Sequence, residues 1–332
     1  MLKASLTRRD LALLAGSAFA LPRARAAAGT AWRLATGYRS ESFQTVNLVT
    51  MAREVEQATQ GELRISVHPN GELGKLGDIR GLVQGGQVDA GETIMSSLAG
   101  EMPIAGADSV PFITNSYDDA HRMWTLQRPL VEKQFTERGL QVLYAVPWPP
   151  QGLYANKPIA GIGDLRGSHM RSYNATTARI ATLVGAEPVD VPMVEVGRAL
   201  AEGRIDSMIT SAVTGVENRV WSFVRYYYDI NAWFPKNIVF ANAKAIQALS
   251  GSTRQALLTA AADAEMRGWA ASVAAAASSV DELRRNGMKV ERVSREFSLD
   301  IRRLGERFSL EWVRQVGREA NDVFIPYFNP QR

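Results

Sequence analysis

One arginine of this sequence stands where binding chemistry is expected. The segment HMRSYN, residues 169–174, is predicted to be a strand followed by a helix that begins near Ala175 to Thr177, and Arg171 lies in that strand. A guanidinium is a rigid planar fork that holds a carboxylate through two parallel charge-assisted hydrogen bonds. Most arginines are solvated or ion-paired on the surface, so the residues alone leave both interpretations of Arg171 open. Asn174 falls near the helix N-cap, where its side chain either caps the helix or faces a ligand.

The common motifs of enzymes are absent from the sequence. It contains no G-x-S-x-G, H-E-x-x-H, P-loop or G-x-G-x-x-G pattern. Its three histidines, His68, His121 and His169, are scattered without metal-ligand spacing, and there is no cysteine to supply a thiolate, a disulfide or a zinc–cysteine site. We therefore predict a protein that is not an enzyme and that holds no metal and no cofactor. An exported α/β hydrolase that uses a pair of cleft carboxylates stays open as an alternative.

The basic charge of the chain is concentrated at its start. The full sequence has 38 basic and 34 acidic residues, and its first 26 residues hold five of the former and one of the latter. Without that segment 33 of each remain, so the rest of the chain is formally neutral. A neutral chain lacks the electrostatic footprint of a polyphosphate partner, and we expect no nucleic acid to bind.

The first residues are typical of a secretory signal peptide. A charged start, MLKASLTRR, precedes the apolar run LALLAGSAFALP and then RARAAA, which offers small residues at A-x-A spacing. Arg8 and Arg9 also suit a twin-arginine signal, and the choice between the two export routes stays open. We predict a signal peptide over residues 1–26, cleavage near Ala26 to Ala28, and a periplasmic protein that is not embedded in the membrane.

Beyond the leader, strands and helices alternate. WRLATGY reads as a strand, NLVTMAREVEQATQ as a helix that ends at Gly61, and LRISVHP as a second strand that stops at Pro69. Alternation of this kind predicts parallel βαβ units with helices on both faces of a sheet.

The pattern then repeats, which predicts two lobes. RIATLVGAEPVDVP resembles EVEQATQGELRISVHP, and VGRALAEGRIDSMIT resembles IRGLVQGGQVDAGETI, in the same order. A long alanine-rich helix over residues 252–286 is expected to span both lobes. The predicted boundaries are residues 27–150 plus about 236–270 for the first lobe, and 151–235 plus about 271–332 for the second. The cleft between two open sheets, at the carboxyl ends of their strands, is the expected binding site.

Three stretches resemble the solute-binding receptors of TRAP (tripartite ATP-independent periplasmic) transporters. They are ANKPIAGIGDLRGSHMRSYN, VGAEPVDVPMVEVGRALAEGRIDSMIT and WFPKNIVFANAKAI, in the family's order. The resemblance implies an α/β, two-lobe periplasmic binding protein, each lobe an open, mostly parallel sheet with helices on both faces, and a long helix across both lobes. It also implies that Arg171 binds a carboxylate of the solute and that Asn174 stands where the family often has an asparagine.

The sequence departs from the family at two places. Many members have a second arginine before the N-K-P motif, where this chain has Gln151. That difference suits a monocarboxylate or a ligand with a neutral polar end, although an exposed loop glutamine is an equal reading. After the strand RIDSMIT, many sialate and dicarboxylate receptors have an acid-asparagine-proline sequence, which is missing here. Thr210 and Ser211 could donate hydroxyl groups instead, to a different solute.

Aromatic residues and one acid complete the predicted site. Trp148 and Trp233 stand at the two junctions between the lobes, and Phe43 follows the first strand, where family members often contact the ligand. Their rings would exclude water and strengthen the Arg171 pair, although Phe43 is equally suited to a core. Glu92 ends a strand of the first lobe and would bind an N–H group of the ligand or pair with a lysine.

These features together predict a periplasmic receptor for a small organic acid. The resemblance implies capture of the acid by hinge closure and delivery to the membrane permease subunits of a TRAP transporter. A sensory binding subunit with the same fold but a signalling partner stays open as a further alternative.

Overall fold

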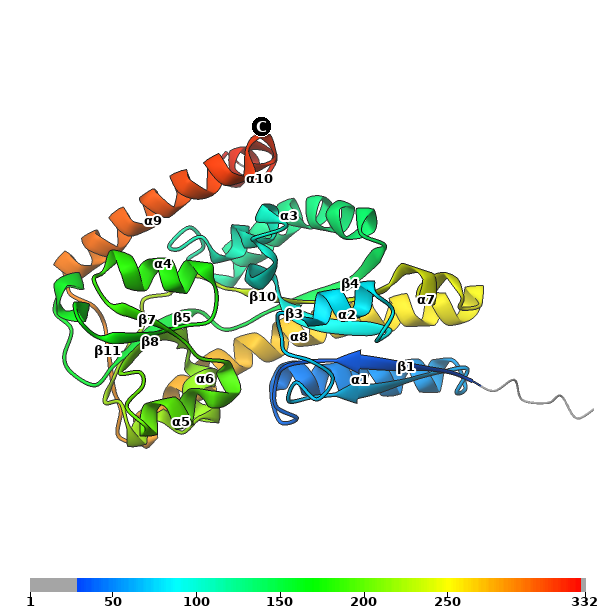
Figure 1. Ribbon diagram of the computed structural model, residues 1–332, viewed down its shortest axis with the longest axis horizontal. Helices are drawn as coiled ribbons and strands as arrows, with labels where there is room; N and C mark the ends of the chain where they lie inside the picture. The colour runs from blue at the N-terminus through cyan, green and yellow to red at the C-terminus, as the bar shows by residue number, and fades with distance from the viewer. Residues whose placement is uncertain (1–28, 330–332) are drawn as a thin grey trace, which may run out of the picture.

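The computed structural model describes residues 29–329, which fold into two α/β lobes side by side (Figure 1). Each lobe is built on its own sheet, and we name them lobe I and lobe II in chain order. The predicted signal peptide lies outside the described residues.

Lobe I contains a five-stranded sheet of order β2-β1-β3-β10-β4. Its strands are β1 (Thr30–Ala35), β2 (Leu63–His68), β3 (Ala90–Ile94), β4 (Leu140–Pro147) and β10 (Lys236–Asn242). The helices of this part of the chain are α1 (Phe43–Ala58), α2 (Ile79–Gln84), α3 (Tyr117–Glu137) and α7 (Ala243–Gln247), with short 3-10 helices η1 (Met95–Leu98) and η2 (Pro103–Ser109).

Lobe II contains a six-stranded sheet of order β11-β9-β5-β8-β6-β7. Its strands are β5 (Gln151–Ala155), β6 (His169–Ser172), β7 (Glu187–Asp190), β8 (Ser207–Ser211), β9 (Tyr226–Tyr228) and β11 (Lys289–Glu291). Its helices are α4 (Ala175–Leu183), α5 (Val196–Ala201) and α6 (Ala212–Glu217), with the 3-10 helices η3 (Ile162–Leu165), η4 (Met193–Glu195) and η5 (Val220–Ser222).

In each sheet one strand runs against all the others. β10 pairs antiparallel with β3 and β4, and β5 pairs antiparallel with β8 and β9, while the remaining pairs are parallel. These two strands are the ones by which the chain enters the other lobe, after β4 and after β9. The two crossing segments are hydrogen-bonded side by side, because Trp148 N donates to Pro235 O at 2.8 Å and Gln151 N donates to Trp233 O at 3.0 Å. The hinge between the lobes is thus a short ribbon of two paired segments.

The long helix α8 (Gly251–Arg285) spans both lobes, as predicted (Figure 1). Ser250 caps its first turn by accepting from Thr253 N. In lobe I, α8 packs on α1 and β4, where Trp269 Nε1 donates to Ala145 O at 3.0 Å. In lobe II, it packs on α6 and β11. The predicted two-lobe α/β fold with one spanning helix is therefore confirmed, and each sheet is mixed by its one reversed strand.

The C-terminal helices α9 (Arg295–Val316) and α10 (Arg318–Phe328) contact both parts of the molecule. α9 packs on η2 and η3, and α10 packs on α3. The side chain of Trp312 donates to Pro103 O at 3.1 Å, and the hydroxyl group of Tyr327 donates to Ile113 O at 3.0 Å. Because these helices join elements of both lobes, the exact domain boundaries stay a prediction.

The close packing of α8 on lobe I leaves no room for a side chain at Gly268. A Cβ atom at Gly268 would lie 2.3 Å from Val146 Cγ2 and 2.8 Å from Asn47 Nδ2, and Asn47 is itself held by Ala264 O. We expect Gly268→Ala to lower the free energy of unfolding by about 1–3 kcal/mol, because overpacking outweighs the gain in helix propensity. Gly81→Ala is the control, because nothing lies within 4 Å of its Cβ position in α2. Urea denaturation measures both changes, and equal stability of the two variants would contradict the packing argument.

Candidate functional site

A cavity of about 520 Å³ lies between the lobes. Residues after β1, β2, β3, β6, β7 and β8 line it, as do the residue after β4 and the start of the reversed strand β5. Because the carboxyl ends of parallel strands meet at one edge of a sheet, both lobes present loops to this space. The lining side chains that carry the argument are Tyr38, Trp148, Gln151, Arg171, Tyr173 and Thr210.

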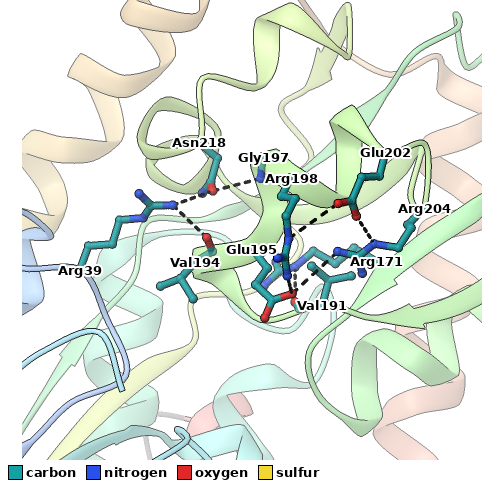
Figure 2. A network of polar contacts seen from close by, with 10 residues as sticks. All are labelled: Arg39, Arg171, Val191, Val194, Glu195, Gly197, Arg198, Glu202, Arg204 and Asn218. Atoms are coloured by element: carbon teal, nitrogen blue, oxygen red, sulfur yellow. Dashed lines mark hydrogen bonds and ion pairs between the residues drawn. The ribbon is translucent and has the colours of Figure 1, made fainter. Parts of the chain in front are cut away.

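Arg171 is a buried cation at this cavity. Its side chain is 3% exposed, and its Nε donates to Val191 O at 2.8 Å (Figure 2). Its guanidinium lies 4.8 Å from the ring centre of Tyr173. Burial lowers the pKa of Arg171 to about 10, which still leaves it charged at neutral pH. Within residues 29–329 no carboxylate lies within 4.0 Å of it, and its two Nη atoms donate to no protein group there. The arrangement leaves the bidentate edge of a desolvated guanidinium for an anion in the cavity.

Gln151 and Tyr173 stand beside this cation. The Tyr173 hydroxyl group donates to Gln151 Oε1 at 3.2 Å, and Gln151 Nε2 donates to Pro149 O at 2.9 Å. Burial raises the pKa of Tyr173, so it remains a neutral phenol. Gln151 is 3% exposed, which excludes the reading as an exposed loop residue.

Trp148 forms an aromatic wall with two residues of lobe I. Its ring centre lies 5.0 Å from that of Tyr38 and 5.2 Å from that of Phe43, which meets it edge-on. Trp148 and Tyr38 line the cavity, whereas Phe43 packs behind them against the core.

Thr210 and Ser211 both line the cavity at the end of β8. The Thr210 hydroxyl group donates to Thr214 Oγ1 at 3.0 Å. The Ser211 side chain caps α6 by accepting from Thr214 N. Thr210 therefore offers lone pairs rather than its proton to the cavity, whereas the Ser211 oxygen already accepts one hydrogen bond from the backbone.

The remaining predicted residues do not line the cavity. Asn174 caps α4 by accepting from Thr177 N at 2.8 Å, and its Nδ2 donates to Ser96 Oγ of lobe I at 2.8 Å. Trp233 is fully buried and contributes its carbonyl group to the hinge. Glu92 is buried beneath Tyr38, accepts hydrogen bonds from Thr36 and Asn237, and has its pKa raised by that burial to about 7.

Three residues that contribute to the site were missed from the sequence. Tyr38 and Tyr173 line the cavity, and Asn237 lies directly behind it. Tyr173 follows Arg171 by two positions and so shares its face of the strand, which was a usable signal. Asn237 gave no such signal in the sequence, because its partners Tyr38 and Trp148 are far from it along the chain.

The lobes touch at the rim of the cavity through Arg39 of lobe I. Its Nη2 donates to Val194 O at 2.9 Å and to Asn218 Oδ1 at 3.3 Å, as Figure 2 shows. Asn218 Oδ1 also accepts from Gly197 N at the start of α5. Together with the Ser96–Asn174 hydrogen bond, this contact joins lobe I to lobe II.

The sequence matches the family model of bacterial extracellular solute-binding proteins, family 7, over residues 34–307. The chain belongs to this family. The resemblance to TRAP receptors that the three sequence stretches indicated is thereby confirmed.

Solved members of the family have the same fold. Two Bordetella pertussis extracytoplasmic solute receptors, DctP6 and DctP7, were crystallised binding pyroglutamic acid and superpose with TM-scores of 0.89 each. They are 35% and 37% identical to this chain, and each alignment covers 90% of it and 100% of the other chain. The 2,3-diketo-L-gulonate-binding periplasmic protein YiaO of Escherichia coli (strain K12) is 28% identical over 222 residues. That match covers 63% of this chain and 65% of the relative, which is less than two thirds of its length.

Between residues 29 and 329 no helix is long and apolar enough to cross a bilayer. In the same part of the chain, no group of three or more His, Asp or Glu side chains is placed to hold a metal ion.

Glu217 of lobe II is buried against lobe I near the Arg39 contact. Burial raises its pKa from the usual 4.5 to about 7, and the repulsion of Glu41 adds to this, while Ser42 and Arg39 act against it. All three of these neighbours belong to the segment of lobe I that follows β1, so contact between the lobes modifies the shift that burial causes.

A carboxyl group whose pKa is raised by folding lowers the free energy of unfolding as the pH rises, because the buried group must then carry a charge. The protonated form of Glu217 is compatible with burial, so its penalty is absent below about pH 4.5 and complete above about pH 7. We expect Glu217→Gln to raise the free energy of unfolding relative to wild type by about 2 kcal/mol more at pH 8 than at pH 5.5. Urea denaturation at both pH values measures this, with Glu202→Gln, on the exposed face of lobe II, as the control. A stability gap that does not change with pH would contradict the assignment.

Proposed function

We propose that this protein is the periplasmic receptor of a TRAP transporter and captures a small monocarboxylate on Arg171. The observation that carries the proposal is the buried guanidinium at the cavity, whose Nη atoms have no counter-ion among the described residues. Desolvation makes such a charge costly alone and favourable when an anion pairs with it.

Capture is coupled to closure of the lobes. The cation and the hydroxyl groups belong to lobe II, whereas Tyr38 belongs to lobe I, so a ligand in the cavity contacts both. A ligand shifts the equilibrium toward the closed form by as much as it binds that form better. The membrane permease would then receive the closed, loaded receptor, after export directed by the predicted signal peptide.

The chemistry of the cavity limits the solute. Its volume of about 520 Å³ suits a small metabolite. Lys75 also lines the cavity but is exposed to solvent, so Arg171 is the one buried cation of the lining, and the neutral Gln151 beside it suits one carboxylate rather than two. The receptors that bind pyroglutamic acid are 35% and 37% identical to this chain. Pyroglutamate is therefore the first candidate ligand.

Two other functions differ in testable ways. An exported hydrolase would turn over a carboxylate ester or amide, and this turnover would be lost when a cleft acid is changed. A sensory subunit would bind the same acid and differ in its partner. Membership of a solute-binding family favours the receptor over the hydrolase.

Arg171→Met removes the cation with little change in volume. We expect the variant to lose the thermal shift caused by pyroglutamate, which at 100 times the dissociation constant corresponds to about 2.7 kcal/mol in wild type. The midpoint of the ligand-free variant should be equal to or above that of wild type, because an unpaired buried charge is removed. Differential scanning fluorimetry measures both quantities.

The matched control is Arg179→Met, which removes a half-exposed arginine that pairs with Glu311. It should keep the full ligand shift. If Arg171→Met kept that shift while the control did too, Arg171 would not be the carboxylate partner.

A further inference from the structure

We propose that Asn237 and Glu92 fix the hydroxyl group of Tyr38 as a hydrogen-bond acceptor toward the cavity, so that the receptor selects carboxylates carrying a neutral N–H group. The inference rests on the proposed function and specifies the solute class. Asn237 and Glu92 are a positioning pair behind the cavity, and the hydroxyl oxygen of Tyr38 at the cavity wall determines specificity.

The orientation of the Asn237 amide follows from Trp148. The indole Nε1 of Trp148 lies 2.9 Å from Asn237 Oδ1, and an indole N–H can only donate. The oxygen of the amide must therefore face Trp148. Asn237 is fully buried, so no solvent offers the amide an alternative orientation.

The same oxygen determines the direction in which the hydroxyl proton of Tyr38 points. The Tyr38 hydroxyl oxygen lies 3.0 Å from Asn237 Oδ1, which can only accept, so the phenol must donate to it. The two lone pairs of Asn237 Oδ1 thus accept one hydrogen bond from Trp148 and one from Tyr38. Burial raises the pKa of Tyr38, which keeps the proton in place.

Glu92 holds the opposite side of the amide. Asn237 Nδ2 donates to Glu92 Oε1 at 2.9 Å, and Thr36 Oγ1 donates to Glu92 Oε2. A flipped amide would turn Nδ2 toward the indole N–H of Trp148 and Oδ1 toward the Glu92 carboxylate, which removes two hydrogen bonds. Protonation of Glu92 on Oε2 leaves the Asn237 contact unchanged, so the arrangement holds in both states of the acid.

Tyr38 consequently offers only lone pairs to the cavity that it lines. Arg171 lines the same cavity of about 520 Å³, so a small acid held on Arg171 lies within the space that Tyr38 faces. An N–H group there forms a hydrogen bond, whereas a ring oxygen meets lone pairs and leaves both acceptors buried without a donor. A cationic amine is disfavoured by the adjacent charge of Arg171, and the neutral lactam N–H of the candidate ligand pyroglutamate suits this acceptor.

The test compares two ligands that differ in one position. Pyroglutamate carries a ring N–H, and 5-oxotetrahydrofuran-2-carboxylate has an oxygen atom there with the same ring and carboxylate. Isothermal titration calorimetry on the wild-type protein should give at least about 100-fold tighter binding of the lactam, as expected of a site built to pair an N–H group. In Tyr38→Phe the preference should fall below about tenfold, because the repelling oxygen is gone.

Asn237→Leu tests the positioning role. With Tyr38 still present, the freed hydroxyl group can turn its proton toward the lactone oxygen, so the lactam preference should also fall below about tenfold. The control is Tyr117→Phe, whose hydroxyl group contacts Ser272 away from the cavity and whose loss should leave the preference at its wild-type value.

The outcomes separate the inference from the proposed function. Equal wild-type affinity for lactam and lactone overturns the inference while leaving capture by Arg171 intact, as does binding of neither ring together with binding of a carboxylate that has no N–H group. A full preference in Asn237→Leu, with the preference lost in Tyr38→Phe, overturns the positioning role. Failure of every carboxylate to bind overturns the proposed function.

Discussion

The burial of one guanidinium without a counter-ion is the constraint on which the rest of the structure depends. Taking Arg171 out of water costs free energy that the more distant carboxylate of Asp190 offsets only in part, and burial lowers the pKa of Arg171 to about 10. The strand β6 keeps it there because β7 and β8 pair with it on both sides, and Val191 O fixes the Nε edge. A receptor needs a cation that has no direct ion-pair partner, since a cation already paired within the protein would have to exchange one partner for another.

The topology explains why such a side chain faces a second lobe rather than solvent. The chain enters each sheet from the other lobe by a reversed strand, β5 or β10, so both crossings occur at the edge where the parallel strands end. The two crossing segments pair with each other, and α8 braces both lobes from the side. Loops from two sheets therefore meet over one cavity, and the short hinge ribbon lets them separate by rotation of a few residues.

Much of this could be predicted from the sequence because it depends on local patterns. Alternating strands and helices, the internal repeat and the alanine-rich run determine the two lobes and the spanning helix, and the strand-to-helix position of Arg171 places it at the cleft. The N-cap position of Asn174 was visible too, whereas Glu92 lies in the middle of β3 and not, as the sequence had suggested, at its end. Whether either side chain faces the cavity or the layer beneath it depends on partners distant in sequence: Ser96 for Asn174, and Asn237 for Glu92. Asn237 lies 145 positions beyond Glu92, and no spacing rule connects them.

The two lobes offer different polar groups to a ligand, and this difference links ligand specificity to closure of the lobes. Lobe II supplies the cation, and lobe I supplies, through Tyr38, an acceptor whose proton is committed to Asn237. On the proposed function, a plain carboxylate pairs with Arg171 of lobe II and forms no hydrogen bond with Tyr38 of lobe I, so it would distinguish the open and closed forms less. A ligand that also donates an N–H group gains a hydrogen bond that exists when the lobes meet. Because a ligand moves a conformational equilibrium only by its difference in affinity for the two states, the donor rather than the carboxylate determines how far the receptor closes.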